Sequence, residues 1–246
     1  MKKYGLIGYP LGHSFSKQFF QKRFKDLDLN DHSYELFEID SLDKFPDLWK
    51  NDVLLKGVNV TIPHKENITQ FLDHQDQSSL KVGATNVIVK RDEKLIGYNT
   101  DYFAFKESLR RWISNDDMKA LVLGSGGASK AVKAALKDLD IEFQEVSRKK
   151  RTDNYTYEEL TTKPQVIQQF QLIINTTPLG TFPNNDSLAD LPYHMLTCSH
   201  YLYDLVYNPE ETAFMKKGIE YGAKTKNGLE MLELQAEKSW DIWNNK

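Results

Sequence analysis

The chain has 246 residues, of which 40% are hydrophobic and 12% aromatic, so it can bury one large core or two smaller ones. Its 32 Lys and Arg residues against 35 Asp and Glu residues leave a net charge of -3, which argues against binding nucleic acid through a broad basic face. The single cysteine, Cys198, excludes an internal disulfide, and no apolar run reaches the ~20 residues of a membrane helix. The N-terminus lacks the apolar core of a signal peptide, so we expect a cytoplasmic protein without membrane, nucleic-acid or metal partners.

Strand-like and helix-like patterns alternate along the first hundred residues. The apolar run 4–7 predicts a buried strand, and residues 16–27 predict a helix because Phe20, Phe24 and Leu27 share one face. The other elements expected here are a strand at 34–39, a short helix around Leu42, Phe45 and Trp49, a strand at 56–60, and a hairpin of 86–90 with 95–98.

A second series of alternating patterns follows. Phe105, Leu109 and Trp112 recur at helical spacing, so a helix is expected to begin at Asp101, and the polar stretch 114–117 breaks the pattern as a domain joint would. The later elements expected are strands at 120–123, 141–146, 172–175 and 201–205, a helix with Val132, Ala135, Leu136 and Leu139 on one face, and a last helix striped by Leu229, Leu232, Ala236, Trp240 and Trp243. This alternation predicts an α/β fold.

Two strand ends in the first half carry opposite charges. Lys65 follows the apolar strand 56–60, and Asp101 follows the strand 95–98. In open α/β sheets the ends of strands present groups to ligands, so the two could form a pair that handles a proton. Alone, each has an ordinary alternative: Lys65 as a solvated surface charge and Asp101 as a helix cap.

A glycine-rich turn joins a strand to a helix at residues 121–129. Gly124 permits a tight turn, and Gly126 lets the backbone approach a pyrophosphate at the helix N-terminus. The third position of this fingerprint usually holds glycine or alanine; here it holds Ser129, which is small and could cap the helix. The pattern favours a dinucleotide site over a plain tight turn.

The end of the next strand indicates which dinucleotide is bound. An acidic residue there would bind the ribose of NAD, whereas arginine would accommodate the extra phosphate of NADP. Four bases, residues 148–151, follow Ser147, and no acid stands among them. This favours NADP, with two alternatives: a solvated basic loop, or Glu145 as the ribose ligand if the strand ends early.

Eight ordered motifs, spread over nearly the whole chain, resemble those of the shikimate dehydrogenase family. Besides the glycine-rich turn they are Gly8-Tyr9-Pro10-Leu11-Gly12-His13-Ser14-Phe15-Ser16, Asn59-Val60-Thr61-Ile62-Pro63-His64-Lys65, Gly83-Ala84-Thr85-Asn86, Asn99-Thr100-Asp101, Asn175-Thr176-Thr177-Pro178-Leu179-Gly180, Asp204-Leu205-Val206-Tyr207-Asn208-Pro209 and Gly228-Leu229-Glu230-Met231-Leu232-Glu233-Leu234-Gln235. The resemblance implies an α/β substrate domain of residues 1–100 and 229–246, completed by the last helix, and a Rossmann-type NADP-binding domain of residues 101–228.

The resemblance also implies roles for individual residues, with Lys65 and Asp101 as the catalytic pair. The residues implied to bind the substrate are Ser14, Ser16, Thr61, Lys65, Asn86, Asp101, Tyr207 and Gln235. Those implied to bind the cofactor are Gly124, Ser125, Gly126, Gly127, Ala128, Ser147, Arg148, Lys149, Thr176, Val206 and Gly228.

The activity that this resemblance implies is the reversible reduction of 3-dehydroshikimate to shikimate by NADPH, a step of chorismate and aromatic amino acid biosynthesis, in a monomer or homodimer. Two alternatives are a quinate or dual quinate/shikimate dehydrogenase that uses NAD, and a nucleotide-binding module without catalysis. One departure from the family lies in the first helix turn, where the chain has Lys17 and Gln18-Phe19-Phe20 in place of the usual proline and His-Asn.

Overall fold

The structure is a computed structural model that describes residues 1–12, 14–113 and 118–244. Two compact units are present: residues 1–103 with 234–246, here called unit 1, and residues 104–233, here called unit 2. Two helices contribute to both units, α4 (Thr100–Trp112) and α8 (Leu229–Trp243). The polar break expected at 114–117 lies outside the described residues.

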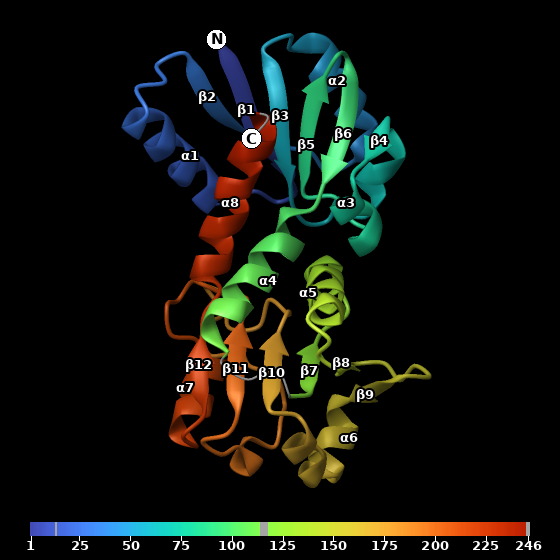
Figure 1. Cartoon of the computed structure of the whole chain (residues 1–246), viewed down its shortest axis with the longest axis vertical. Coiled ribbons are helices and arrows are strands. Elements are labelled where there is room, and N and C mark those ends of the chain that lie inside the picture. Colours follow the sequence, from blue (N-terminus) through green and yellow to red (C-terminus); the bar gives the residue numbers. More distant parts are fainter. Residues whose placement is uncertain (13, 114–117, 245–246) are drawn as a thin grey trace. The chain divides into compact units, whose positions relative to one another are not determined.

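Unit 1 contains a mixed six-stranded sheet in the order β2-β1-β3-β5-β6-β4 (Figure 1). Its strands are β1 (Lys2–Gly8), β2 (His32–Glu38), β3 (Leu55–Val60), β4 (His74–Gln75), β5 (Val87–Arg91) and β6 (Lys94–Tyr98). Its helices are α1 (Phe15–Asp26), α2 (Phe45–Asn51) and α3 (Gln77–Val82), with short 3₁₀ turns η1 (Leu42–Lys44) and η2 (Asn67–Phe71).

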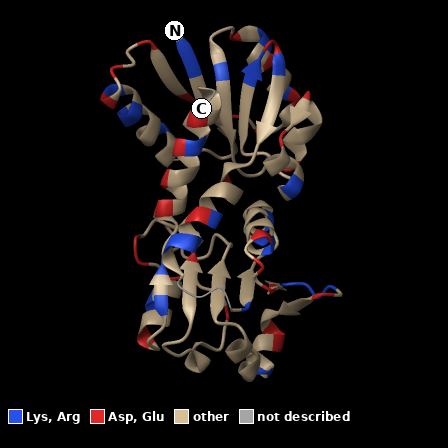
Figure 2. Ribbon diagram, in the orientation of Figure 1, with Lys and Arg blue, Asp and Glu red and all other residues tan. Residues whose placement is uncertain are grey.

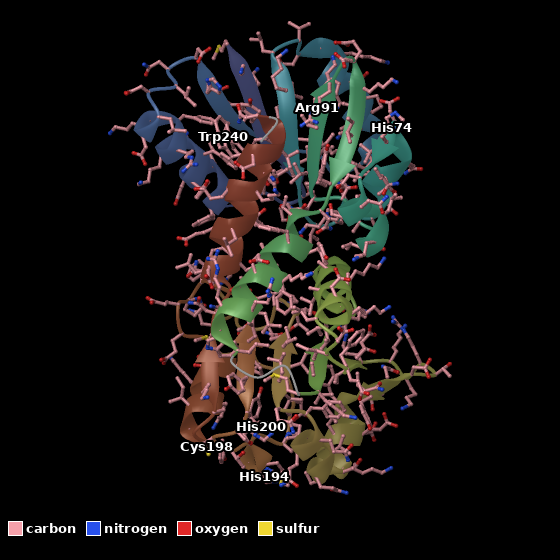
Figure 3. The ribbon with its side chains drawn as sticks, viewed as in Figure 1. His74, Arg91, His194, Cys198, His200 and Trp240 are labelled. Atoms are coloured by element: carbon pink, nitrogen blue, oxygen red, sulfur yellow. The ribbon has the colours of Figure 1, made fainter. Side chains whose placement is uncertain are left out.

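Two apolar clusters cover the two faces of this sheet. On one face, Phe20 and Phe24 of α1 pack with Trp240 and Trp243 of α8 against strand residues such as Tyr4. The chain thus returns to its first unit through the C-terminal part of α8, and the Trp240 side chain can be followed in Figure 3. The cluster on the other face joins α2 and η2 to the sheet through Ile7, Phe45, Trp49, Val58, Val60, Ile68 and Ile88.

The strand directions bring four chain segments to one edge of this sheet. β1 and β3 run parallel, and β3 and β6 are each antiparallel to β5, so β1, β3 and β6 all end at the same edge. β5 begins there, because it runs the other way. Residues that follow β1, β3 and β6, or precede β5, are therefore neighbours despite their separation in sequence.

Unit 2 contains a parallel six-stranded sheet in the order β12-β11-β10-β7-β8-β9. Its strands are β7 (Ala120–Leu123), β8 (Phe143–Ser147), β9 (Asn154–Thr156), β10 (Leu172–Asn175), β11 (Tyr201–Asp204) and β12 (Lys224–Lys226). The helices are α5 (Gly127–Asp138), α6 (Tyr157–Thr162) and α7 (Ala213–Glu220), with 3₁₀ turns η3 (Pro164–Gln169) and η4 (Tyr193–Met195). The order reverses between β7 and β10, which is where such sheets bind dinucleotides.

Every strand and helix expected from the sequence is present, within a few residues of the expected bounds. Three details were wrong: Leu27 lies beyond the end of α1 and is 46% exposed, Leu139 lies beyond the end of α5, and Leu229 at the start of α8 is 37% exposed. The short elements β4, α3, β9, α6, α7 and β12 were not foreseen. Within the described ranges, no helix is both long enough and apolar enough to cross a membrane.

Candidate active site

The ammonium of Lys65 and the carboxylate of Asp101 meet in unit 1. Lys65 Nζ donates to Asp101 Oδ2 over 2.7 Å, and the two side chains are only 18% and 12% exposed. Lys65 follows β3 and Asp101 lies in the first turn of α4, just after β6, so both come from the shared sheet edge. Partial burial excludes most water, so the pair is held more firmly than a solvated ion pair would be.

The turn that carries Lys65 is fixed by hydrogen bonds on both sides. The buried His64 ring places Nε2 2.7 Å from the carbonyl oxygen of Ile39, and the Thr85 amide donates to the Lys65 carbonyl over 2.8 Å. The His64 amide donates to the Thr61 carbonyl, which closes the turn after β3. The Lys65 backbone therefore has little freedom, and its ammonium is presented from a rigid base.

Asn86 and Asn99 hold the first turn of α4. The Thr100 amide donates to Asn86 Oδ1 over 2.7 Å, and Asn86 Nδ2 donates to Thr100 Oγ1 over 3.0 Å. The Tyr102 amide donates to Asn99 Oδ1 over 3.0 Å. Asp101 stands between these two anchored residues. Asn86 thus has a structural task, and its second amide hydrogen remains available to a ligand.

Three small hydroxyl residues expected at the site also belong to this edge. Ser14 and Ser16 follow β1, and Thr61 follows β3. Ser14 is the N-cap of α1 and accepts from the Lys17 amide over 3.3 Å. Ser16 lies beside the buried phenol of Tyr34: burial raises the pKa of Tyr34, and a hydrogen bond from Ser16 counteracts part of that shift.

Gln235 reaches unit 1 through α8 and is 9% exposed. A buried chain of hydrogen bonds fixes this helix turn: Ser239 Oγ donates to the Gln235 carbonyl over 2.7 Å, and Asn59 Nδ2 donates to Ser239 Oγ over 3.0 Å. Tyr34 completes the chain by donating to Asn59 Oδ1 over 2.8 Å. In the described part of the chain, the Gln235 side-chain amide itself makes no hydrogen bond, so it is free to bind a ligand.

In unit 2 the glycine-rich turn has the features of a phosphate cradle. Gly124 has a φ of 103°, which only glycine adopts readily, and a Cβ there would lie 2.9 Å from Thr176 Oγ1. Gly126 is the N-cap of α5 and makes no side-chain cap, and the space where its Cβ would project is open. The first amides of α5 are therefore available to an anion.

The idea that Ser129 caps α5 was wrong, because the cap position belongs to Gly126. Ser129 lies inside the helix and is fully buried, as a small residue must be where helix and sheet pack closely. Its hydroxyl oxygen has no hydrogen-bond partner among the described residues.

Two of the four bases in the loop after β8, residues 148–151, form ion pairs with carboxylates. Lys150 pairs with Glu159 at 2.9 Å, and Arg151 pairs with Glu145 at 3.2 Å. Figure 2 shows the loop as a blue segment between β8 and β9. Among the described residues, Arg148 and Lys149 have no carboxylate partner, and both are exposed.

The alternative role for Glu145 as the ribose ligand is not supported. β8 does not end early but runs to Ser147, and Glu145 lies inside it. Its two oxygens bind Lys133 at 2.6 Å and Arg151 at 3.2 Å, and its side chain is 11% exposed. The carboxylate is therefore already occupied.

The remaining expected cofactor residues lie at the carboxyl ends of the parallel strands. Thr176 follows β10 and donates from Oγ1 to the Leu123 carbonyl over 2.6 Å. Val206 follows β11, and its carbonyl accepts from the Gly228 amide over 3.1 Å. A Cβ on Gly228 would lie 2.1 Å from the Leu205 carbonyl oxygen, so this close approach requires glycine. Tyr207 is half-buried beside Val206, and burial raises its pKa.

Asp204 is a buried acid to which the sequence pattern gave no role, although it opens one of the eight motifs. Asp204 is fully buried, accepts from Asn175 Nδ2 over 2.9 Å and from the Val206 amide over 3.0 Å, and so ties the loop after β10 to the loop after β11. Thr212 donates to its other oxygen over 2.6 Å. Its place at the end of the apolar strand β11 is the sequence feature that could have indicated a role for this acid.

The lone cysteine belongs to the opposite edge of this sheet. Cys198 is exposed and precedes β11, as does His200, whereas the cofactor residues follow the strands (Figure 3). Neither lies near the groups described above. Among the described residues, no group of three His, Cys, Asp or Glu side chains is placed to hold a metal ion.

Comparison with known proteins shows which proteins the chain resembles. A family model described as the shikimate dehydrogenase substrate binding domain matches residues 6–88. A curated relative from Clostridium beijerinckii, named shikimate dehydrogenase (NADP(+)), is 40% identical over 99% of this chain and 92% of its own length.

Two solved structures are similar over the whole chain. Shikimate dehydrogenase 1 from Peptoclostridium difficile has a TM-score of 0.86 and 35% identity, covering 100% of this chain and 93% of that one. A shikimate 5-dehydrogenase from Thermus thermophilus, solved in complex with NADP(H) and shikimate, has a TM-score of 0.83 and 27% identity, covering 100% and 94%.

Proposed function

The chain belongs to the shikimate dehydrogenase family, and from that premise we propose that Lys65 and Asp101 are its catalytic pair. The family's reaction is the NADP-dependent interconversion of shikimate and 3-dehydroshikimate, an oxidoreduction at a CH–OH group. The observation that carries the assignment is the 2.7 Å contact between the Lys65 ammonium and the Asp101 carboxylate at low exposure.

The chemistry requires a proton and a stabilised oxygen. NADPH, when bound, supplies the hydride. As the ketone is reduced, negative charge develops on its oxygen, and the Lys65 ammonium stabilises this charge and donates a proton to that atom. Asp101 accepts a hydrogen bond from Lys65 and aims the ammonium, while its second oxygen can bind a substrate hydroxyl. In the oxidative direction, neutral Lys65 takes the proton back from the hydroxyl.

The polar groups of unit 1 fit a small acid that carries several hydroxyls. We assign the substrate carboxylate to the hydroxyls of Ser14 and Ser16, at the start of α1. The ring hydroxyls are assigned to Thr61, Asn86, Asp101 and Gln235 in unit 1, and the family resemblance also implies Tyr207 as a substrate residue. The uncommitted amide of Gln235 and the spare hydrogen of Asn86 support this assignment.

The groups of unit 2 fit a phosphorylated dinucleotide. The uncapped α5 N-terminus and the open space beside Gly126 suit a pyrophosphate, and the unpaired charges of Arg148 and Lys149 suit a 2′-phosphate. The pyrophosphate is assigned to Gly124, Ser125, Gly126, Gly127 and Ala128, the 2′-phosphate to Ser147, Arg148 and Lys149, and the nicotinamide side to Thr176, Val206 and Gly228. Unit 1 is then the substrate domain and unit 2 the cofactor domain.

A single set of assays tests these assignments. Shikimate and quinate are each offered with NADP and with NAD, and the absorbance of the reduced nicotinamide is followed. We expect shikimate with NADP to give the highest kcat/KM. Faster oxidation of quinate with NAD would make the chain a quinate dehydrogenase of the same family, and no turnover with any pair would make it a binding module.

A further inference from the structure

Asn154 holds the basic loop together, and sequence reasoning gave it no role. It is the first residue of β9, is 6% exposed, and lies seven positions after Ser147. A buried amide close to four exposed bases needs an explanation, because a polar group is buried only where hydrogen bonds compensate for lost water.

The Asn154 side chain bonds to both ends of the loop. Its Nδ2 donates to Ser147 Oγ over 2.7 Å and lies 3.1 Å from the Lys149 carbonyl oxygen. Its Oδ1 accepts from the Arg151 amide over 2.6 Å. Ser147 adds a further tie by donating to the Lys149 carbonyl over 2.9 Å. One amide thus closes the loop on either side of Arg148 and Lys149.

The four bases of this loop fall into two pairs, one with carboxylate partners and one without. Lys150 is bound by Glu159 and by the Asn154 carbonyl oxygen, at 2.9 and 2.7 Å. Arg151 is bound by Glu145. The two bases without a carboxylate in the described chain, Arg148 and Lys149, are therefore the ones whose backbone the Asn154 amide fixes.

We propose that Asn154 is a positioning residue for cofactor specificity: it holds the loop in the conformation in which Arg148 and Lys149 receive the 2′-phosphate that distinguishes NADP from NAD. This inference rests on the proposed cofactor site in unit 2. Arg148 and Lys149 are adjacent like charges without a carboxylate partner among the described residues, so they repel one another, and a loop without this tie spreads over more conformations. Binding of the 2′-phosphate would then have to order the loop. This cost lowers the affinity for ligands that carry the 2′-phosphate and leaves the affinity for ligands without it unchanged.

The test measures binding of two probes to the full-length protein by calorimetry. One is 2′,5′-ADP, which carries the 2′-phosphate, and the other is 5′-AMP, which lacks it. The variants are Asn154→Ala and Ser147→Ala, and the control is Asn184→Ala, an exposed asparagine of the same unit whose side chain makes no hydrogen bond in the described chain.

For Asn154→Ala we expect affinity for 2′,5′-ADP to fall about tenfold, a factor that corresponds to about 1.4 kcal/mol. Affinity for 5′-AMP should change less than about twofold. In steady-state assays the KM for NADP should rise, while kcat at saturating NADP and the KM for shikimate stay unchanged. Ser147→Ala should shift the ratio of the two affinities in the same direction by a smaller factor, and Asn184→Ala should leave it unchanged.

Equal losses for both probes would make Asn154 a purely structural residue and overturn the proposal, as would an unchanged ratio. If Asn154→Ala does not fold, Asn154→Ser, whose single hydroxyl cannot make the three bonds of the amide at once, decides the matter by the same ratio. Binding of the two probes to the wild-type protein tests the proposed cofactor site separately from the role of Asn154. If wild type binds 2′,5′-ADP no more tightly than 5′-AMP, the cofactor assignment itself is wrong, whatever the variants do.

Discussion

Lys65 Nζ lies 2.7 Å from Asp101 Oδ2, although 36 positions separate the two residues in the chain. The contact arises from strand direction, because β3 and β6 are both antiparallel to β5 and so deliver their following residues to one edge. Each partner is also held from behind, Lys65 by the Thr85 amide and Asp101 by its place between Thr100 and Tyr102. A pair fixed in this way can act on a proton without first reorganising.

Replacing Lys65 with Met should lower kcat by about 10²–10⁴-fold, the usual contribution of a positioned acid–base group. The KM for shikimate should change far less, because the other proposed ligands of the substrate hydroxyls remain. The measurement is steady-state oxidation of shikimate with NADP. Lys56→Met, at an exposed lysine in β3, serves as the control and should keep its rate. A Lys65 variant that retained more than about half of its turnover would show that Lys65 is not the acid.

Replacing Arg148 with Asp should exchange the cofactor preference. If Arg148 binds the 2′-phosphate as proposed, the variant loses a bidentate contact and gains a repelling carboxylate, so kcat/KM with NADP should fall sharply while that with NAD holds or improves. Arg151→Gln is the matched control, because Arg151 is already bound by Glu145 and its loss should affect the two cofactors alike. If Arg148→Asp lowered kcat/KM with NADP and with NAD by the same factor, Arg148 would be supporting the fold instead.

The sequence predicted what depends on local pattern. Strand ends, the glycine-rich turn and the four bases are all visible in a short window, so Lys65, Asp101 and Arg148 could be proposed as site residues without a structure. It could not predict what depends on pairing across the chain. The Asn59 contact with Ser239 joins residues 180 positions apart, and nothing in either segment indicates the other.

Two further examples show why the rest was missed. Ser129 was expected to cap α5, but the helix begins three residues earlier, because glycine at position 126 can serve as the cap and leaves the amides free. Asn154 was overlooked because asparagine in a polar loop usually marks a turn, and only β8–β9 pairing turns its amide toward Ser147.

Asp204 should make the stability of the protein depend on pH. Burial raises the pKa of Asp204 to about 6 from an ordinary 3.8, although Thr212, Val206 and Asn175 oppose the shift with hydrogen bonds. The folded protein therefore holds a proton that the unfolded chain has released between these values. Its free energy of unfolding should fall as pH rises from about 4 to about 6. Asp204→Asn should remove this pH dependence, which over the whole window changes the free energy of unfolding by about 1–3 kcal/mol.

The measurement is urea unfolding of wild type and Asp204→Asn at several pH values across that window. The informative quantity is the difference between the two free energies of unfolding, which should change with pH. Asp190→Asn, an exposed carboxylate of the same unit, should run parallel to wild type. Parallel curves for Asp204→Asn as well would mean that Asp204 ionises in the folded protein as it does in the unfolded chain.

Gln235 tests whether α8 completes the substrate site. Its side chain is 9% exposed and makes no hydrogen bond within the described chain, while its backbone is fixed through Ser239 and Asn59 to β3. A primary amide can both donate to and accept from a hydroxyl, so a ring hydroxyl of shikimate would satisfy it. Gln235→Ala should therefore raise the KM for shikimate, at a cost of about 1–3 kcal/mol if a buried partner is left unpaired.

The KM for NADP and the melting temperature should barely change in this variant, because the lost amide supports no other residue that the structure describes. Glu233→Ala, at an exposed position two residues earlier on α8, controls for general effects of substitution in the helix. Ser239→Ala should give a smaller rise in the KM for shikimate, since it loosens the helix turn without removing the ligand. Unchanged shikimate kinetics in Gln235→Ala would remove Gln235 from the site, and α8 would then serve unit 1 through the packing of Ala236, Trp240 and Trp243 alone.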